Sequence, residues 1–422
     1  MSTEVRLVHL ADLHLGFTGP ATLVFKEGEP RAGRYVREVD VEEATKHLIQ
    51  RISRLQPPAD VVLLAGDLFH RPAPLPRAIY LAAQAIHALT RRGIEVVLID
   101  GNHERSAGRL HAGSPLDYLR ELEAHVVNGP HYEVIGVGEK GWRSDRLKDQ
   151  LAVHALPYQA LLQGEFAGVA PLPGRLNVLV AHGRVGGAPS MPEANTLGLR
   201  VAEIPSEVLR RGWDYVALGD WHVHGFRPLG DAPAYYAGTP EALTFGDAAD
   251  YPLRPGDPRA IGGALDVRLA PGHAVEVSTI RNEGRRPALK LRPIDAAGLS
   301  ADALLEQVRT RLTADLPAEA IVRLEVQHCP RATWETVDQA ELAQLRDRVR
   351  RCEIVWDLVE PESASHELTT LTVEEQWEGF LAAQIPDAAE RDALVRLGRE
   401  RIEAARQQVQ QQRVAAGQAD EQ

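Results

Sequence analysis

The chain contains a series of short apolar runs, each followed at once by polar residues. These runs cover 5–11, 60–65, 94–99, 176–181 and 213–219. Short apolar runs that end in turn signals predict buried β-strands. Amphipathic helix patterns over 41–55 and 76–92 lie between the first three runs. Strands that alternate with helices predict a layered α/β domain with its chemistry at the strand ends.

Three parts are expected along the chain. Residues 1–285 contain the α/β pattern, interrupted by a loop without clear periodicity at 16–40. Residues 286–362 predict a small α+β domain of strands and two helices, at 300–312 and 336–351. Residues 363–422 predict a helical tail whose first helix starts with a capping box at Thr372 and whose polar end, from Gln407, is disordered.

Composition and charge narrow the class of protein. A length of 422 residues is typical of two or three domains. The two cysteines form no disulfide framework, so a reducing cytoplasm is expected. No apolar run approaches the roughly 18 residues of a membrane span, and the N-terminus lacks the layout of a signal peptide. The net charge of −12 argues against a broadly basic nucleic-acid coat, but it leaves room for a local basic groove or for metal ions.

The polar residues after the apolar runs are carboxylates, an amide and imidazoles. Side chains two residues apart on an extended segment point the same way, so Asp12 and His14 can converge on one ion. A lone histidine at a strand end is more often a solvated residue than a ligand. Residue types that bind metals at the ends of five strands are, however, hard to assign to chance. The candidates are Asp12, His14, Asp67, Asn102, His103, His182, Asp220, His222 and His224.

Oxygen and imidazole donors without thiolates suit Mn²⁺, Fe²⁺ or Zn²⁺ rather than a soft metal. Two such ions that share one carboxylate, roughly 3.5–4 Å apart, can activate a water and hold a phosphate in line for its attack. The candidates are numerous enough to bind two ions.

The successive motifs resemble those of calcineurin-like metallophosphoesterases: Asp12-x-His14, Gly66-Asp67, Gly101-Asn102-His103-Glu104, His182-Gly183 and the segment 219–224. The sequences of segments 66–70 and 236–241 are most similar to those of SbcD-type DNA-repair exonucleases, the nuclease partners of SMC-like ATPases. The resemblance covers about 5–245, and beyond that only the layout matches. It implies a two-sheet α/β sandwich flanked by helices, then a capping domain, then a tail that binds an SbcC-like ATPase.

The resemblance also implies roles for individual residues. Asp12 and His14 bind one metal, Asp67 bridges both metals, and Asn102 and His182 bind the second.

His103 is then a catalytic imidazole that binds neither metal and stabilises the transition state or protonates the leaving oxygen. His70 lies near a DNA phosphate, unless it is a solvent-exposed loop histidine. Arg31 and Arg34 are candidates for contacts with DNA phosphates, although a solvated face beside nearby acids explains them equally.

One segment departs from the family pattern of Gly-His-x-His. Here Gly219 is followed by Asp220, and His222 and His224 come two and four residues later. An ungapped match makes Asp220 and His222 ligands and leaves His224 as a substrate contact. A two-residue insertion makes His222 and His224 the ligands instead. We prefer the ungapped match because it keeps the ligands at the strand end.

These observations predict a cytoplasmic, two-metal DNA phosphodiesterase, with Mn²⁺ as the expected metal, in a complex with an SMC-like ATPase. Exonuclease activity is expected, and endonuclease activity is left open. One alternative is a stand-alone phosphoesterase acting on nucleotides or small phosphates. Another is a non-catalytic scaffold that binds metal and DNA. The sequence does not decide strand polarity or whether a homodimer forms.

Overall fold

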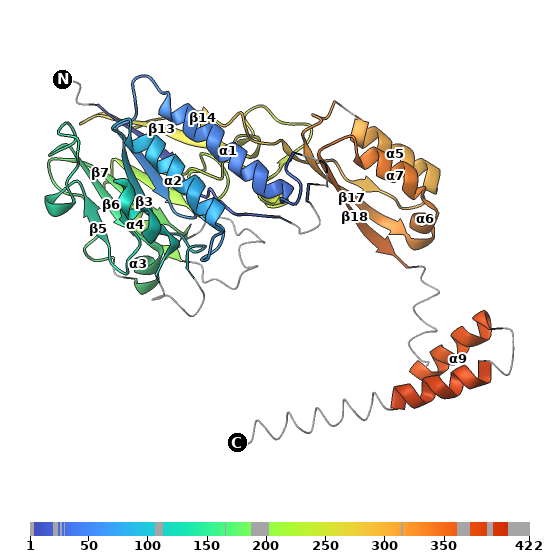
Figure 1. Cartoon of the computed structure of the whole chain (residues 1–422). Coiled ribbons are helices and arrows are strands. Elements are labelled where there is room, and N and C mark those ends of the chain that lie inside the picture. The colour runs from blue at the N-terminus through green and yellow to red at the C-terminus, as the bar shows by residue number, and fades with distance from the viewer. Residues whose placement is uncertain are drawn as a thin grey trace, which may run out of the picture. The chain divides into compact units, whose positions relative to one another are not determined.

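A computed structural model describes residues 4–19, 24–25, 28, 30–105, 113–164, 166–186, 202–313, 315–360, 372–385 and 391–403 (Figure 1). The chain divides into two compact units. The first comprises Met1–Arg292, Thr310–Leu324 and Ala343–Ile354, and the second comprises the remaining segments. The domain boundaries at 285 and 362 stay a prediction, and the expected disordered end from Gln407 lies outside the described residues.

The first unit is built on two sheets. Within the described residues, one sheet has six strands in the order β14 (Glu276–Arg281), β13 (Gly263–Leu269), β1 (Val5–Leu10), β2 (Val61–Ala65), β3 (Glu95–Ile99) and β4 (His125–Val127). The other, counted over the same residues, has five in the order β11 (Ala234–Tyr236), β10 (Tyr215–Gly219), β7 (Leu176–His182), β6 (Leu151–Leu156) and β5 (Glu133–Ile135). The central pairs β1–β2, β2–β3, β6–β7 and β7–β10 are parallel.

The two sheets face each other across an apolar core. Leu7, Leu63 and Val97 from the first sheet lie in one buried cluster with Val178 and Val180 from the second. The alternate residues of the same strands are buried on the outer faces of the sheets. Burial on both faces explains why these strands read as continuous apolar runs in the sequence.

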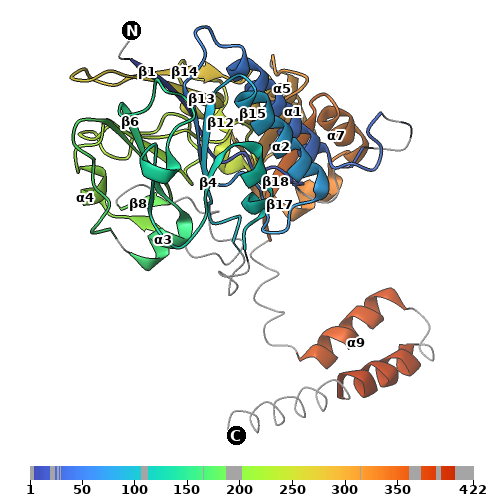
Figure 2. The same ribbon diagram turned by 60° about the vertical axis from the view of Figure 1, so that its left-hand side comes forward.

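Helices cover the outer face of each sheet. α1 (Val36–Ser53) and α2 (Pro76–Thr90) pack on the six-stranded sheet. α3 (Tyr158–Gln163) and α4 (Ser206–Leu209) lie on the opposite side, against the five-stranded sheet (Figure 2). The predicted two-sheet α/β sandwich is confirmed.

α1 begins five residues earlier than its apolar pattern indicates, so the predicted loop at 16–40 is wrong at its end. The first turns of α1 contain charged residues that are buried, which hides the amphipathic period. Arg37 donates from Nη1 to Asp40 over 2.6 Å and from Nη2 to Glu241 over 3.0 Å. Burial of these charges is tolerated because they pair with one another.

The region after the sandwich contains shorter elements. In the first unit, β12 (Ala249–Asp250) pairs with β15 (Ala288–Lys290), and β15 pairs with the start of β17 (Ile321–Pro330). In the second unit, β16 (Ile294–Asp295) pairs with the end of β17. The remaining elements are α5 (Ala301–Thr313), α6 (Arg331–Thr336), α7 (Gln339–Arg346) and β18 (Arg351–Val359), which pairs with β17.

The single helix predicted over 336–351 is wrong. It is replaced by α6 and α7, which are separated at Val337 and Asp338. The Asp338 carboxylate accepts hydrogen bonds from the backbone N–H groups of Ala340 and Glu341 over 2.8 and 3.1 Å. Asp338 thus starts a new helix where the apolar pattern runs on without a break.

The tail begins with α9 (Val373–Gln384), and Thr372 and Glu375 form the predicted capping box. A second helix covers 391–403. The Nε1 atom of Trp377 donates to the Leu394 carbonyl over 3.2 Å, so the two helices pack on each other. Among the helices described, none has the length and apolar character needed to cross a membrane.

Candidate metal centre

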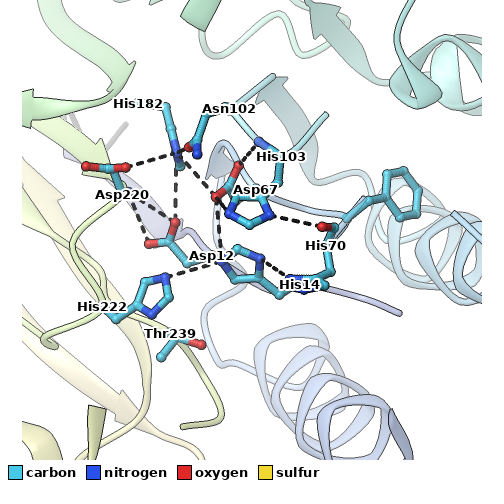
Figure 3. Close-up of polar contacts among 12 residues, drawn as sticks. Asp12, His14, Asp67, His70, Asn102, His103, His182, Asp220, His222 and Thr239 are labelled. Atoms are coloured by element: carbon cyan, nitrogen blue, oxygen red, sulfur yellow. Dashed lines mark hydrogen bonds and ion pairs between the residues drawn. The ribbon is translucent and has the colours of Figure 1, made fainter. Parts of the chain in front are cut away.

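The candidate ligands gather where five strands end (Figure 3). Asp12 follows β1, Asp67 follows β2, Asn102 follows β3, His182 ends β7 and Asp220 follows β10. The parallel strand pairs place these carboxyl ends at the same edge of each sheet, and the packing of the sheets brings the two edges together. Ligand sites in α/β folds occupy this position.

Several of these residues have an unusual backbone conformation. Asp12, His14, Asp67 and Asp220 have φ values of 55°, 46°, 51° and 97°. Aspartate, asparagine and histidine are the non-glycine types found most often with positive φ. Each such residue costs on the order of 1–3 kcal/mol, and such strain concentrates at functional sites. The folded chain therefore holds these side chains in place against a local preference.

Two glycines make room for the ligands. A Cβ atom on Gly66, which has a φ of 87°, would clash with the ring of His182. A Cβ atom on Gly101 would clash with the carboxylate of Asp67 and with the same ring. The glycines that precede Asp67 and Asn102 therefore let the two sheets approach closely enough for their ligands to meet.

One group of donors is rich in imidazole and comprises Asp12, His14, Asp67 and His222, which we name the imidazole-rich set. The Nε2 atom of His14 lies 3.2 Å from Nε2 of His222 and 3.5 Å from Oδ2 of Asp67. Burial lowers the pKa of His14 well below its ordinary value, which leaves a neutral ring with a lone pair for a cation. Burial also raises the pKa of Asp12 to about 6, so this carboxyl group needs a cation to remain ionised at lower pH.

A second group, which we name the oxygen-rich set, comprises Asp67, Asn102, His182 and Asp220. The Nε2 atom of His182 lies 3.0 Å from Oδ1 of Asn102, 3.5 Å from Oδ2 of Asp67 and 4.0 Å from Oδ1 of Asp220. The Nδ1 atom of His182 donates to the Ala65 carbonyl over 2.8 Å. This bond fixes the tautomer that directs the Nε2 lone pair into the site.

Asp67 belongs to both sets. Its Oδ2 atom lies 3.5 Å from a ring nitrogen on each side, His14 and His182. Convergent, buried carboxylate, amide and imidazole donors of this kind fit two divalent cations that share one carboxylate.

His103 lies beside the two sets. Its backbone N–H donates to Oδ1 of Asp67 over 3.0 Å, and its Nδ1 atom donates to the His70 carbonyl over 2.9 Å. The Nε2 atom is left facing the centre, 3.8 Å from Oδ2 of Asp67. A ring held at one nitrogen with the other directed at the reacting group can act as an acid or base.

His70 also contacts the centre. Its Nδ1 atom lies 3.3 Å from Nδ1 of His14, and the ring of Phe17 contacts it edge-on at a centroid distance of 5.0 Å. Burial lowers the pKa of His70 to about 4, so this ring is neutral near pH 7.

The structure does not bring three other candidates into the centre. Both ring nitrogens of His224 are engaged elsewhere, with the Ala237 carbonyl over 2.7 Å and the Thr279 hydroxyl over 3.1 Å. Arg31 pairs with Glu43, and Arg34 pairs with Glu42 over 2.6 Å. Asp220, by contrast, lies beside His182, as the ungapped match requires.

Asp247 is a functional candidate that the sequence reasoning missed. Its Oδ1 atom lies 3.1 Å from Nδ1 of His222, and its Oδ2 atom accepts the backbone N–H groups of Leu243 and Thr244, each over 3.0 Å. The spacing of Thr244 and Asp247 is that of a capping box, which is a detectable signal. The capping-box spacing does not, however, reveal the contact between Asp247 and His222, which lies 25 residues earlier in the chain.

A groove of about 490 Å³ in the first unit shares His70 with the centre. Phe17, Leu243, Phe245 and Ile321 contribute apolar surface to it. Its charged lining residues are Arg37, Arg71, Arg323, Arg351 and Glu353. Arg37 is already paired with acids, and Glu353 lies within 3.2 Å of Arg323 and 3.7 Å of Arg351, so the groove keeps an excess of positive charge.

The fold and the centre are those of a phosphoesterase. The model of the calcineurin-like phosphoesterase family matches residues 5–253, which is more than half of the chain, and the chain belongs to this family. The DNA double-strand break repair protein Mre11 of Methanopyrus kandleri is 28% identical over 256 residues, covering 58% of this chain and 51% of that protein.

Two further relatives have similar names. Mre11 of Methanocaldococcus jannaschii is 35% identical over 136 residues, covering 31% of this chain and 33% of that protein. The SbcD component of the nuclease SbcCD of Bacillus subtilis is 31% identical over 160 residues, covering 36% of this chain and 34% of that protein. The chain thus spans about half of the first relative and about a third of the other two.

Proposed function

We propose that this chain is a cytoplasmic, metal-dependent DNA phosphodiesterase that processes DNA ends as an exonuclease. The observation that carries the proposal is the pair of donor sets joined by Asp67, with His103 directed at them. The names of the relatives, a double-strand break repair protein and a component of a nuclease, support it.

The imidazole-rich set would hold one divalent ion and the oxygen-rich set the other, with Mn²⁺ the expected metal. When bound, the ions supply the charge that polarises the phosphate and activates water. The protein supplies the positioning. Because His103 is held at Nδ1 by the His70 carbonyl, its Nε2 atom is placed to donate a proton to the leaving oxygen.

The groove beside His70 favours DNA over a small phosphate. Arg71 is exposed, and no ion pair of it is found among the described residues. The guanidinium of Arg323 lies over the ring of Phe245 at 4.4 Å. Cationic side chains bind phosphates along a strand, and aromatic surfaces stack on bases. A single small phosphate needs no such extension.

We also propose that the tail binds an SbcC-like, SMC-family ATPase. Val373, Phe380 and Leu397 of the tail are exposed by 58%, 57% and 50%. Large exposed apolar side chains on paired helices are suited to a coiled-coil partner.

The proposed binding of the ATPase by the tail is tested by substitution. Phe380→Asp should abolish co-purification with the partner. Tyr118→Asp, at an exposed aromatic residue of the first unit, should leave co-purification intact.

The activity is tested by incubating end-labelled linear duplex DNA with Mn²⁺ and the wild type, His103→Ala or His131→Ala. His131 is exposed and lies outside both donor sets, so it is the matched control. Loss of label is expected with the wild type and His131→Ala only, and only with metal. If wild type that holds two metals releases no label with or without the ATPase, the proposed exonuclease activity is overturned. Equal activity in His103→Ala would remove the proposed role of that residue.

A further inference from the structure

The two donor sets differ in their chemistry. Apart from the shared Asp67, the imidazole-rich set offers two ring nitrogens and one carboxylate. The oxygen-rich set offers one ring nitrogen, one amide oxygen and the carboxylate of Asp220. The side chains that differ are therefore mostly nitrogen donors on one side and mostly oxygen donors on the other.

Asp220 is held in this position by the backbone. Its φ of 97° is one that few side chains tolerate, and its N–H donates to Oδ1 of Asp12 over 3.1 Å. Its side chain is only 17% exposed and lies 4.0 Å from His182. In the described part of the chain, no lysine or arginine forms an ion pair with it. A carboxylate buried in this way is stable when a cation binds it.

The donor types predict different metals at the two positions. Carboxylate and carbonyl oxygens favour Mn²⁺ and Mg²⁺, whereas imidazole favours Zn²⁺ and Fe²⁺. Most sites bind Zn²⁺ more tightly than Mn²⁺, so the useful quantity is the ratio of the two affinities at each position. Asp220 also adds negative charge, which strengthens the binding of hard cations held mainly by electrostatic attraction.

We infer that the centre is asymmetric, with Asp220 making the oxygen-rich set a Mn²⁺-selective position, while the imidazole-rich set binds Zn²⁺ in preference. With Mn²⁺ in excess and one equivalent of Zn²⁺ present, zinc occupies the imidazole-rich set and manganese occupies the oxygen-rich set. This inference rests on the proposed two-metal function, but it concerns binding and needs no turnover.

The test uses the full chain stripped of metal, equilibrated with one equivalent of Zn²⁺ in excess Mn²⁺, and freed of unbound ions. Elemental analysis gives the stoichiometry, and electron paramagnetic resonance reports whether the Mn²⁺ ions are coupled to each other. Wild type in Mn²⁺ alone should give the spectrum of a coupled pair. Added Zn²⁺ should convert it to the spectrum of isolated Mn²⁺, with one zinc bound.

Two variants test the part played by Asp220. Asp220→His replaces the carboxylate with an imidazole and should bind a second zinc in place of manganese when a second equivalent is added. Asp220→Asn keeps an oxygen but removes the charge, so its Mn²⁺ affinity should fall about ten-fold or more. Asp231→His is the control, because Asp231 is exposed and pairs with Arg210 outside both sets.

The outcomes separate the two proposals. Wild type that binds no stoichiometric metal overturns the two-metal function and this inference with it. Wild type that binds two ions but distributes the single equivalent of zinc over both positions, so that the spectrum of coupled Mn²⁺ pairs persists, overturns only the asymmetry. An Asp220→His variant with wild-type preference does the same. If Asp220→His does not fold, as judged by circular dichroism, the asymmetry of the centre is still decided by two measurements. These are the metal stoichiometry of the wild type and the Mn²⁺ affinity of Asp220→Asn.

Discussion

The carboxylate of Asp247 lies 3.1 Å from the Nδ1 atom of His222, on the side of the ring opposite His14. A carboxylate behind a ligand histidine fixes the ring and strengthens it as a donor. Asp247 also holds its own turn through Leu243 and Thr244, and Leu243 and Thr244 both line the groove. The imidazole-rich set is thus coupled to the surface on which we propose that DNA lies.

Asp247→Asn should weaken Zn²⁺ binding about 10- to 100-fold, the range typical for loss of a partner behind a ligand. Isothermal titration of the metal-free chain measures it. Thr244→Ala is the matched control, because it breaks the same capping box without touching His222. It should cost about 1 kcal/mol of stability and leave the metal affinity unchanged. Equal effects of both variants would assign Asp247 to the turn alone.

Arg71→Ala should weaken binding of duplex DNA and lower the slope of log Kd against log salt by about 1, as expected for one lost phosphate contact. Hydrolysis of a small phosphodiester such as bis-p-nitrophenyl phosphate should be unchanged, because that substrate does not reach the groove. Lys148→Ala, which removes an exposed charge paired with Asp145, is the control. An unchanged salt slope in Arg71→Ala would mean that DNA takes another path.

Gly101→Ala should abolish metal binding. The new methyl group overlaps the Asp67 carboxylate and the His182 ring, and relieving such overlap typically costs about 1–3 kcal/mol. Gly129→Ala is the comparison, because a methyl group there meets no atom within 4 Å. Metal content and thermal unfolding measure the two effects separately. Normal metal content in a folded Gly101→Ala protein would contradict the proposed arrangement of ligands.

His9 should make the fold sensitive to acid. Its ring is buried with Nδ1 2.9 Å from the Tyr215 hydroxyl, and burial lowers its pKa to about 3 from an ordinary 6.5. Between these two pKa values, His9 is therefore protonated in the unfolded chain and neutral in the folded chain. The stability that this group provides is complete above pH 6.5 and is lost as pH falls towards 3, by about 2 kcal/mol at pH 5.

His9→Gln, which keeps a polar partner for Tyr215, should remove that part of the acid sensitivity. Urea unfolding at pH 5 and pH 7.5 measures it, and His131→Gln at an exposed site serves as the control. The same loss of stability in His9→Gln as in the wild type would place the acid sensitivity in other groups.

Much of the sandwich and many of the candidate ligands could be predicted from the sequence, because both depend on local patterns. A strand buried on two faces is an uninterrupted apolar run, and the residue that ends it must turn. Asp12, Asp67 and Asn102 could therefore be assigned to strand ends before their neighbours were known. Thr372 could likewise be assigned as a helix cap from a spacing of three residues.

Other features depend on partners distant in the sequence. Arg37 and Asp40 are buried in α1 because they pair with each other and with Glu241, which a search for apolar periodicity does not detect. His224 has the residue type and spacing of a ligand, but it bonds to Thr279, 55 residues away.

The sequence by itself determined which residue types stand at the strand ends, and hence the phosphoesterase chemistry they can support. Only the tertiary structure decided how they divide into two sets around Asp67, that Asp220 rather than His224 faces His182, and that Asp247 stands behind His222. The reason is physical. Strand ends follow from hydrophobic burial along one segment, whereas the division of ligands follows from the packing of two sheets whose contacts no single segment specifies.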